Sequence, residues 1–159
     1  MNRFSLLTLL LLPLCVLAAP STLPLRPIES TLAVLESAVT NVKVEDLAVT
    51  YRRGQQIEKR KGFCVKNIEF ARKSIATLRR QESLEEAVQL ALVLSDLNET
   101  LETLADRLAQ VESPANSASI ALTWAKALDS AQDNLYKVAE PFNAAVLKHA
   151  AAADRVLSQ

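Results

Sequence analysis

Apolar residues recur every three or four positions along most of the chain beyond residue 28. This spacing gathers them on one side of an α-helix, and no segment shows the strict alternation of apolar and polar residues that marks a β-strand. The first stripe follows Pro27, which suits the first turn of a helix because its missing N–H would have no partner there. A helix over 28–49 is therefore predicted, interrupted only at Asp46, with the stripe Ile28, Leu32, Leu35, Val39, Val42 and Val49.

The two glycines of the chain mark the next division. Gly54 and Gly62 bracket residues 55–61, which we interpret as a connection or a short, poorly held helix. A second helix is expected over 63–80, with its apolar side formed by Cys64, Ile68, Ala71, Ile75 and Leu78.

The apolar stripe then restarts out of phase, which indicates a new helix. Ser83 followed three residues later by Glu86 is the signature of a capping box. A third helix should therefore begin near Leu84 and run to about residue 112, before Pro114. Its apolar side is Leu90, Leu94, Leu97, Leu101, Leu104, Leu108 and Val111.

The last stretch continues the helical spacing to the end of the chain. Pro141 lies inside this pattern and should kink or split the helix, because proline removes a backbone hydrogen bond and clashes with the preceding turn. We therefore predict an all-α fold, an antiparallel bundle of four to five helices forming one domain over 28–159. The last stripe is Ile120, Trp124, Leu128, Ala131, Leu135, Val138 and Phe142, followed by Ala145, Val146, His149, Ala152, Ala153 and Val156.

The beginning of the chain differs in character. A short basic start, an apolar run and closing small residues predict a secretory signal peptide over 1–19, followed by an extended, proline-punctuated leader over 20–27. The apolar run is too short to span a membrane, so the protein is expected to be secreted, extracellular or in the cell wall, without a transmembrane segment. Cleavage leaves Cys64 as the single cysteine, which favours a buried thiol and leaves a disulfide-linked dimer as the alternative.

Charge is balanced overall but segregated along the chain. The 18 basic and 18 acidic residues give no net charge, which argues against nucleic-acid binding. Residues 52–80 carry ten basic and two acidic residues, whereas 81–112 carry eight acidic residues and one basic residue. Either these neighbouring helices complement each other, or the basic stretch binds anionic lipid, acidic polysaccharide or a protein partner. No base-stacking aromatic residues are expected within it; its candidate binding residues are Arg52, Arg53, Lys59, Arg60 and Lys61.

Catalytic chemistry finds no support in the sequence. The single histidine, His149, lies on an apolar helix side and is interpreted as a packing residue, and no nucleophile, metal-ligand or phosphate-loop motif occurs. We therefore expect a non-enzymatic protein without metal or cofactor. Two modification sites are considered: Asn98 in Asn-Glu-Thr, on a side of its helix expected to be exposed, as a glycosylation site, and Lys59-Arg60 as a dibasic processing site in an accessible connection.

The interior offers a candidate site for an apolar ligand. The aromatic residues are expected in the core or in a groove, and the alanine-rich last helix either packs closely or leaves room between helices. The residues selected by position for such an apolar groove are Leu94, Leu97, Leu101, Trp124, Leu128 and Leu135.

The layout of the chain resembles a family of secreted fungal proteins. A leader ending in Leu17-Ala18-Ala19-Pro20, an opening helix, the leucine-rich stripe from Leu90 to Leu108 and an alanine-rich terminal helix are similar to the hydrophobic surface-binding protein A family, which includes cell-wall galactomannoproteins. The resemblance implies a helical protein that adsorbs to hydrophobic surfaces or holds fatty acids or sterols between its helices. The first hypothesis is therefore a secreted binder of apolar ligands or surfaces, and the alternative is an effector- or inhibitor-like protein that engages a partner through 52–80.

Overall fold

The computed structural model describes residues 23–157 except 82 and 113. Within these residues the chain forms α2 (Leu25–Thr40), a short 3-10 helix η1 (Val44–Asp46), α3 (Tyr51–Arg80), α4 (Leu84–Ala109) and α5 (Ala115–Leu157). The part of the chain described contains no strand, so the prediction of an all-α bundle is confirmed. The predicted signal peptide over 1–19 lies outside the described residues.

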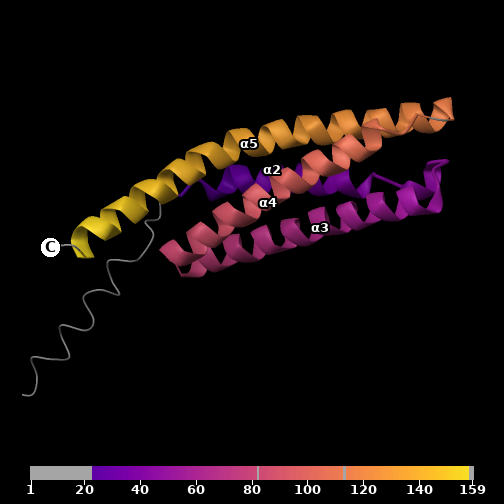
Figure 1. The fold of residues 1–159 in the computed structure, drawn as a ribbon. Coiled ribbons are helices and arrows are strands. Elements are labelled where there is room, and N and C mark those ends of the chain that lie inside the picture. The colour runs from indigo at the N-terminus through magenta and orange to yellow at the C-terminus, as the bar shows by residue number, and fades with distance from the viewer. Residues whose placement is uncertain (1–22, 82, 113, 158–159) are drawn as a thin grey trace, which may run out of the picture.

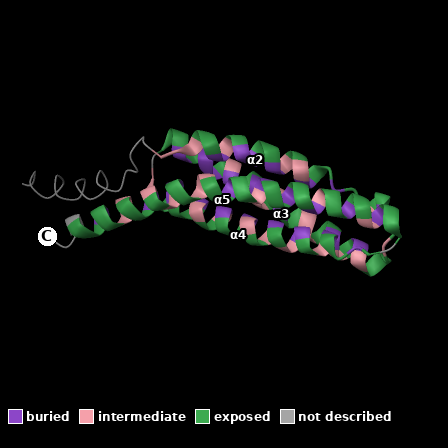
Figure 2. Ribbon diagram, turned by 90° about the horizontal axis from the view of Figure 1, so that it is seen from above, coloured by how far each residue is buried: buried purple, intermediate pink, exposed green. Residues whose placement is uncertain are grey.

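The four α-helices run alternately up and down in one elongated bundle (Figure 1). Each helix packs on its neighbours in sequence, and α2 also packs on α5, which closes the ring α2–α3–α4–α5. Buried positions face inward on every helix and exposed positions face outward (Figure 2). The core is built almost entirely from Leu, Ile, Val and Ala, as the apolar stripes predicted.

The first helix differs from its predicted extent at both ends. It begins at Leu25, so the last three residues of the predicted extended leader are helical, and Pro27 lies in the first turn as expected. It ends at Thr40 rather than at residue 49. The stripe continues beyond the helix because Val42 and Leu47 are still buried on the core from the non-helical connection. The apolar pattern therefore continues along the chain past the end of the helix, because residues of the connection are also buried.

Residues 55–61, predicted as a connection or a short, poorly held helix, are instead the interior of α3, a single helix of 30 residues. Thr50 caps it: its side-chain hydroxyl accepts a hydrogen bond from the Arg53 N–H at 3.4 Å. Gly54 is buried, and a Cβ there would lie 3.1 Å from Val44 Cγ1, whereas Gly62 is exposed with nothing within 4 Å of such an atom. Glycine costs about 1 kcal/mol in a helix interior, and burial of Ile57 and Cys64 on either side outweighs this cost.

The third helix follows its prediction closely. Ser83 is its N-cap, and the side-chain hydroxyl accepts a hydrogen bond from the Glu86 N–H at 3.4 Å. The helix ends at Ala109, three residues before the predicted end, and Val111 remains buried on the core.

The last helix is continuous through Pro141 over 43 residues, so of the two predicted alternatives, a kink or a split, the split does not occur. Figure 1 shows α5 curving along its length and reaching beyond the ends of α3 and α4. Pro141 is exposed, while Phe142 and Val146 are buried on the opposite side. Because the proline ring and the lost hydrogen bond lie toward solvent, the helix continues past Pro141 without losing its core contacts. None of the helices described is apolar enough over a sufficient length to cross a membrane.

Candidate functional site: the outer face of α3 and α4

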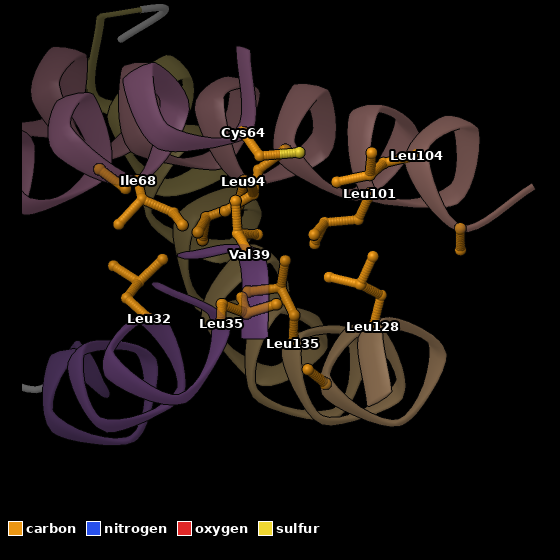
Figure 3. Close-up of a cluster of buried hydrophobic side chains, with 14 of the residues drawn as sticks. Leu32, Leu35, Val39, Cys64, Ile68, Leu94, Leu101, Leu104, Leu128 and Leu135 are labelled. Atoms are coloured by element: carbon orange, nitrogen blue, oxygen red, sulfur yellow. The ribbon is translucent and has the colours of Figure 1, made fainter. Parts of the chain in front are cut away.

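The predicted apolar groove is not assembled as one site. Its five leucines are at most 1% exposed and belong to the packed core, where Leu94, Leu101, Leu128 and Leu135 converge between the helices (Figure 3). Trp124 is only partly buried and lines a surface hollow of about 420 Å³ between α2 and α5. None of the five leucines lines this hollow or a second one of about 300 Å³ beside Val44 and Tyr51.

The predicted basic patch is only partly available for binding. Arg53 donates a hydrogen bond to the Gln110 carbonyl oxygen at 2.8 Å, and Lys61 donates one to the Val42 carbonyl oxygen at 2.6 Å. Lys61 also lies 3.6 Å from the Glu58 carboxylate. Arg52 and Lys59 are exposed and Arg60 is half-buried. Two of the five selected residues therefore hold the bundle together.

A row of alternating lysines and phenylalanines runs along the outside of α3: Lys59, Phe63, Lys66, Phe70 and Lys73. Steps of four and three residues place all five on one side of the helix. Phe63 is 39% and Phe70 52% exposed, which corrects their prediction as core or groove residues. The ammonium nitrogens of Lys59 and Lys73 lie 5.8 Å and 5.6 Å from the ring centres of Phe63 and Phe70, within cation–π range.

These phenylalanines also correct the expectation that no aromatic residues interleave the basic stretch. Tyr136 is another aromatic residue predicted inside that is 64% exposed, whereas Phe142 is fully buried as predicted. The signal was present in the sequence: Phe63 precedes the core residue Cys64, and Phe70 precedes Ala71. A helical step of 100° per residue moves both rings off the core side.

An acidic row lies on the outside of α4, next to the α3 row: Glu85, Leu92, Asp96, Glu99 and Asp106, all exposed. Leu92 is 55% exposed in the midst of these carboxylates. Within the described residues, none of the four carboxylates forms an ion pair. Together, the two rows form what we call the α3–α4 outer face.

Two contacts between the helices, the Arg53–Gln110 hydrogen bond described above and one between Arg107 and Gln56, show that both rows belong to one face. Arg107 on α4 donates a hydrogen bond to the Gln56 side-chain oxygen on α3 at 2.8 Å. Phe63 and Phe70 follow Gln56 at seven-residue steps, and Asp96 precedes Arg107 by eleven residues, about three turns. Each therefore lies on the side of its helix that borders the other helix.

The same contacts give the register of the antiparallel pair. In the Arg53–Gln110 and Gln56–Arg107 contacts, the two residue numbers add to 163. Phe70 is therefore level with Leu92 to within one residue, and Lys66 lies level with the turn between Asp96 and Glu99. The α3–α4 outer face thus has Phe63 and Phe70 between lysines on α3 and Leu92 between carboxylates on α4.

The charge of α3 is compensated from an unexpected side. The Arg72–Glu36 and Arg79–Glu29 ion pairs, both 2.7 Å, join α3 to α2 and not to α4. These ion pairs therefore do not support the prediction that the basic helix α3 and the acidic helix α4 neutralise each other. Each pair is 40–47% exposed, so each contributes about 0 to 1 kcal/mol.

Cys64 is fully buried and points into the core (Figure 3). The buried-thiol prediction is confirmed, and burial raises the thiol pKa to about 12, although a backbone hydrogen bond and the nearby Arg60 oppose the shift. A disulfide with a second chain is therefore wrong as a prediction, because the sulfur atom is inaccessible and protonated in the folded bundle.

The two predicted modification sites also lie in unexpected surroundings. Asn98 is half-buried, its side-chain oxygen is buried without a hydrogen-bond partner among the described residues, and its backbone carbonyl accepts a hydrogen bond from Gln132 of α5 at 3.3 Å. The expectation that Asn98 is exposed is therefore wrong. Lys59 and Arg60 lie within α3 rather than in an accessible connection, so the premise of a processing loop is also wrong.

His149 is half-buried, which fits its interpretation as a packing residue. Among the residues described, no group of three or more His, Cys, Asp or Glu side chains is placed to hold a metal ion. Comparison with known proteins finds no matching family model, no matching curated protein and no matching solved structure. The assignment of function therefore rests on the α3–α4 outer face itself.

Proposed function

We propose that this chain is a non-enzymatic interaction protein that binds a protein partner through the α3–α4 outer face. One observation carries the proposal: Phe63 and Phe70 are 39% and 52% exposed between lysines, directly beside the exposed carboxylates of α4. Aromatic side chains dominate the energetics of protein interfaces, and charged residues are typical of the rim around them. The same arrangement on an unbound surface leaves that apolar area in water.

The presence of both charges on one face favours a protein over an anionic polymer. Lys59, Lys66 and Lys73 would attract a membrane of anionic lipid, an acidic polysaccharide or a nucleic acid. The carboxylates of Asp96 and Glu99 lie at the same level of the face and would be repelled by the same ligand. A folded protein can place opposite charges against each row, which gives specificity and correct orientation.

The hypothesis of apolar-ligand binding stays a prediction in two forms. An interior ligand would have to displace leucines that are at most 1% exposed. Adsorption to a hydrophobic surface would use Phe63, Phe70 and Leu92, the same residues that we assign to a protein interface. The experiment must therefore separate a protein partner from a lipid surface.

The test compares the wild-type chain with the double variant Phe63→Ser/Phe70→Ser. Both rings are exposed, so the variant should keep its helical circular-dichroism spectrum. Immobilised protein is exposed to extracts of the cells that make it, and separately to phosphatidylcholine vesicles with and without phosphatidylglycerol. We expect a discrete partner to be retained at least about tenfold less by the variant, and no vesicle binding by either protein.

The matched control is Tyr136→Ser on α5, which removes an aromatic side chain that is 64% exposed elsewhere. It should retain the partner like the wild type. Vesicle binding that depends on Phe63 and Phe70 would replace the protein partner by a lipid surface. Equal loss in the Tyr136→Ser control would contradict the assignment of this face.

A further inference from the structure

We infer that the partner of the α3–α4 outer face is a second copy of this chain, in a dimer whose two-fold axis runs along the bundle. The inference rests on the proposed function, since it uses the same face, and adds the identity of the partner and its orientation. A symmetric dimer requires a patch that is complementary to itself. The α3–α4 outer face meets this condition because it carries both charges side by side.

The charge pattern selects one of two possible axes. A two-fold axis across the helices would place α3 on α3 of the second copy, lysine against lysine. An axis parallel to the helices places α3 on the second copy's α4 and α4 on its α3. Of these two arrangements, only the second brings opposite charges together, and it does so twice because of the symmetry.

The register within one chain determines which residues would meet. Rotation about an axis along the bundle keeps every residue at its own level, so α3 faces the α4 residues that lie level with it. Lys66 then lies opposite the second copy's Asp96 and Glu99. Phe70 lies opposite the second copy's Leu92.

Both ends of the face fit the same arrangement. Near the start of α3, Lys59 lies within one helical turn of the level of Asp106, and at its end Arg80 lies level with the start of α4, near Glu85. No like charges of the two rows are brought level with each other. The match therefore extends over the length of the helix pair.

The dimensions of the face are adequate for a specific dimer. The 26 residues of α4 make it about 39 Å long, and two packed helices are roughly 20 Å wide. About 800 Å² per copy would be covered, which is the area per partner of a standard protein interface. Contact with a second copy would remove the exposed parts of Phe63, Phe70 and Leu92 from water.

The test uses charge reversal and mixing of the purified full chain, measured by sedimentation equilibrium. Lys59→Glu/Lys66→Glu reverses α3, and Glu99→Lys/Asp106→Lys reverses α4. Each variant alone should dimerise at least about tenfold more weakly than the wild type. An equimolar mixture should recover a heterodimer, because each contact then joins opposite charges again.

A control variant, Lys126→Glu, changes an exposed lysine on α5 and should leave the wild-type dimer unchanged. Weakening of each variant alone, together with recovery on mixing, would support the two-fold arrangement. Packing of α3 on α3 would leave the α3-reversed variant alone no weaker than the wild type, because like charges would face each other there before and after the reversal. Wild-type protein that stays monomeric to about 200 µM would overturn the inference. It would not overturn the proposed function, which is measured by partner capture, and a series of larger oligomers would overturn the two-fold axis.

Discussion

Burial changes the chemistry of a single residue most clearly at Cys64. Its thiol is fully buried and its pKa is raised from 9.0 to about 12, chiefly because burial disfavours the thiolate. In a Cys15→Ala variant, in which Cys64 is the single cysteine, we expect a disulfide reagent such as DTNB to leave the folded protein unmodified and to label the unfolded protein rapidly. Labelling of the folded protein at the rate of a free thiol would show that the sulfur is accessible.

The same shift predicts the pH dependence of stability. Between pH 9.0 and about 12 the unfolded thiol loses its proton while the folded thiol keeps it. The folded state then binds more protons, so the free energy of unfolding falls as pH rises through this window and is unaffected by this group below it. Urea unfolding of the wild type and of Cys64→Ala should give a pH slope that is steeper for the wild type, because other groups titrate in both proteins.

The sequence correctly predicts that Cys64 is buried and wrongly predicts that Asn98 is exposed, and the difference has a physical reason. The thiol lies in phase with Ile68 and Ala71, so its own helix places it in the core. Asn98 lies beside its apolar stripe, and whether that side faces solvent depends on where the next helix packs. Gln132 of α5 donates a hydrogen bond to the backbone carbonyl of Asn98, and this contact between two helices cannot be derived from the spacing of one helix.

At the scale of the elements, α3 is where the sequence pattern and the structure differ most. Between Tyr51 and Lys61 the apolar stripe is thin, because Ile57 is its single fully buried apolar side chain. Periodicity therefore predicts no more than a connection or a short, poorly held helix there, and the two glycines argue against a long one. Packing of the 44–49 segment on Gly54 supplies the missing support, since this segment approaches the helix within van der Waals distance.

Substitution of the two glycines tests this explanation. Gly62 is exposed with open space around it, so Gly62→Ala should raise the free energy of unfolding by about 1 kcal/mol through helix propensity. Gly54→Ala should gain less, because its Cβ would lie 3.1 Å from Val44 Cγ1 and force that side chain to move. Urea unfolding followed at 222 nm measures both. An equal gain at Gly54 would mean that the 44–49 segment does not pack tightly on α3.

The candidate face shows how far helix-level prediction reaches. The helical phase of Cys64 already places Phe63 and Phe70 outside the core, so the alternating row could have been derived from the sequence. That aromatic residues are usually buried led to the opposite prediction. The level of this row relative to Asp96 and Glu99 could not be derived, since it depends on the register between two helices.

At the scale of the whole molecule, the ring order of the helices decides which surfaces remain free. The α2 side of α3 is taken by the ion pairs of Arg72 and Arg79. The outer side of α3, next to α4, is left with lysine, phenylalanine and no intrachain ion pair among the residues described. Charge segregation in the sequence thus becomes a two-signed surface in the folded bundle. We assign binding to this surface because the core is filled and leaves no interior site for a ligand.

Truncation of a core leucine tests whether the interior is filled. Leu101 is fully buried, so Leu101→Ala should lower the free energy of unfolding by about 2 to 5 kcal/mol through lost burial and an uncollapsed cavity. Leu122→Ala on the outside of α5, where the side chain is 45% exposed, is the matched control and should change it by less than about 0.5 kcal/mol.

Thermal unfolding with oleic acid separates a filled bundle from a hollow one. A ligand that binds only the folded state must raise Tm, and a filled core leaves no interior site for the acid, so Tm of the wild type should not rise. If Leu101→Ala costs less than about 1 kcal/mol and oleic acid raises Tm, the helices already leave room around Leu101. The interior would then be the binding site, as the apolar-ligand hypothesis predicts. The proposal that the main function lies on the α3–α4 outer face would be wrong.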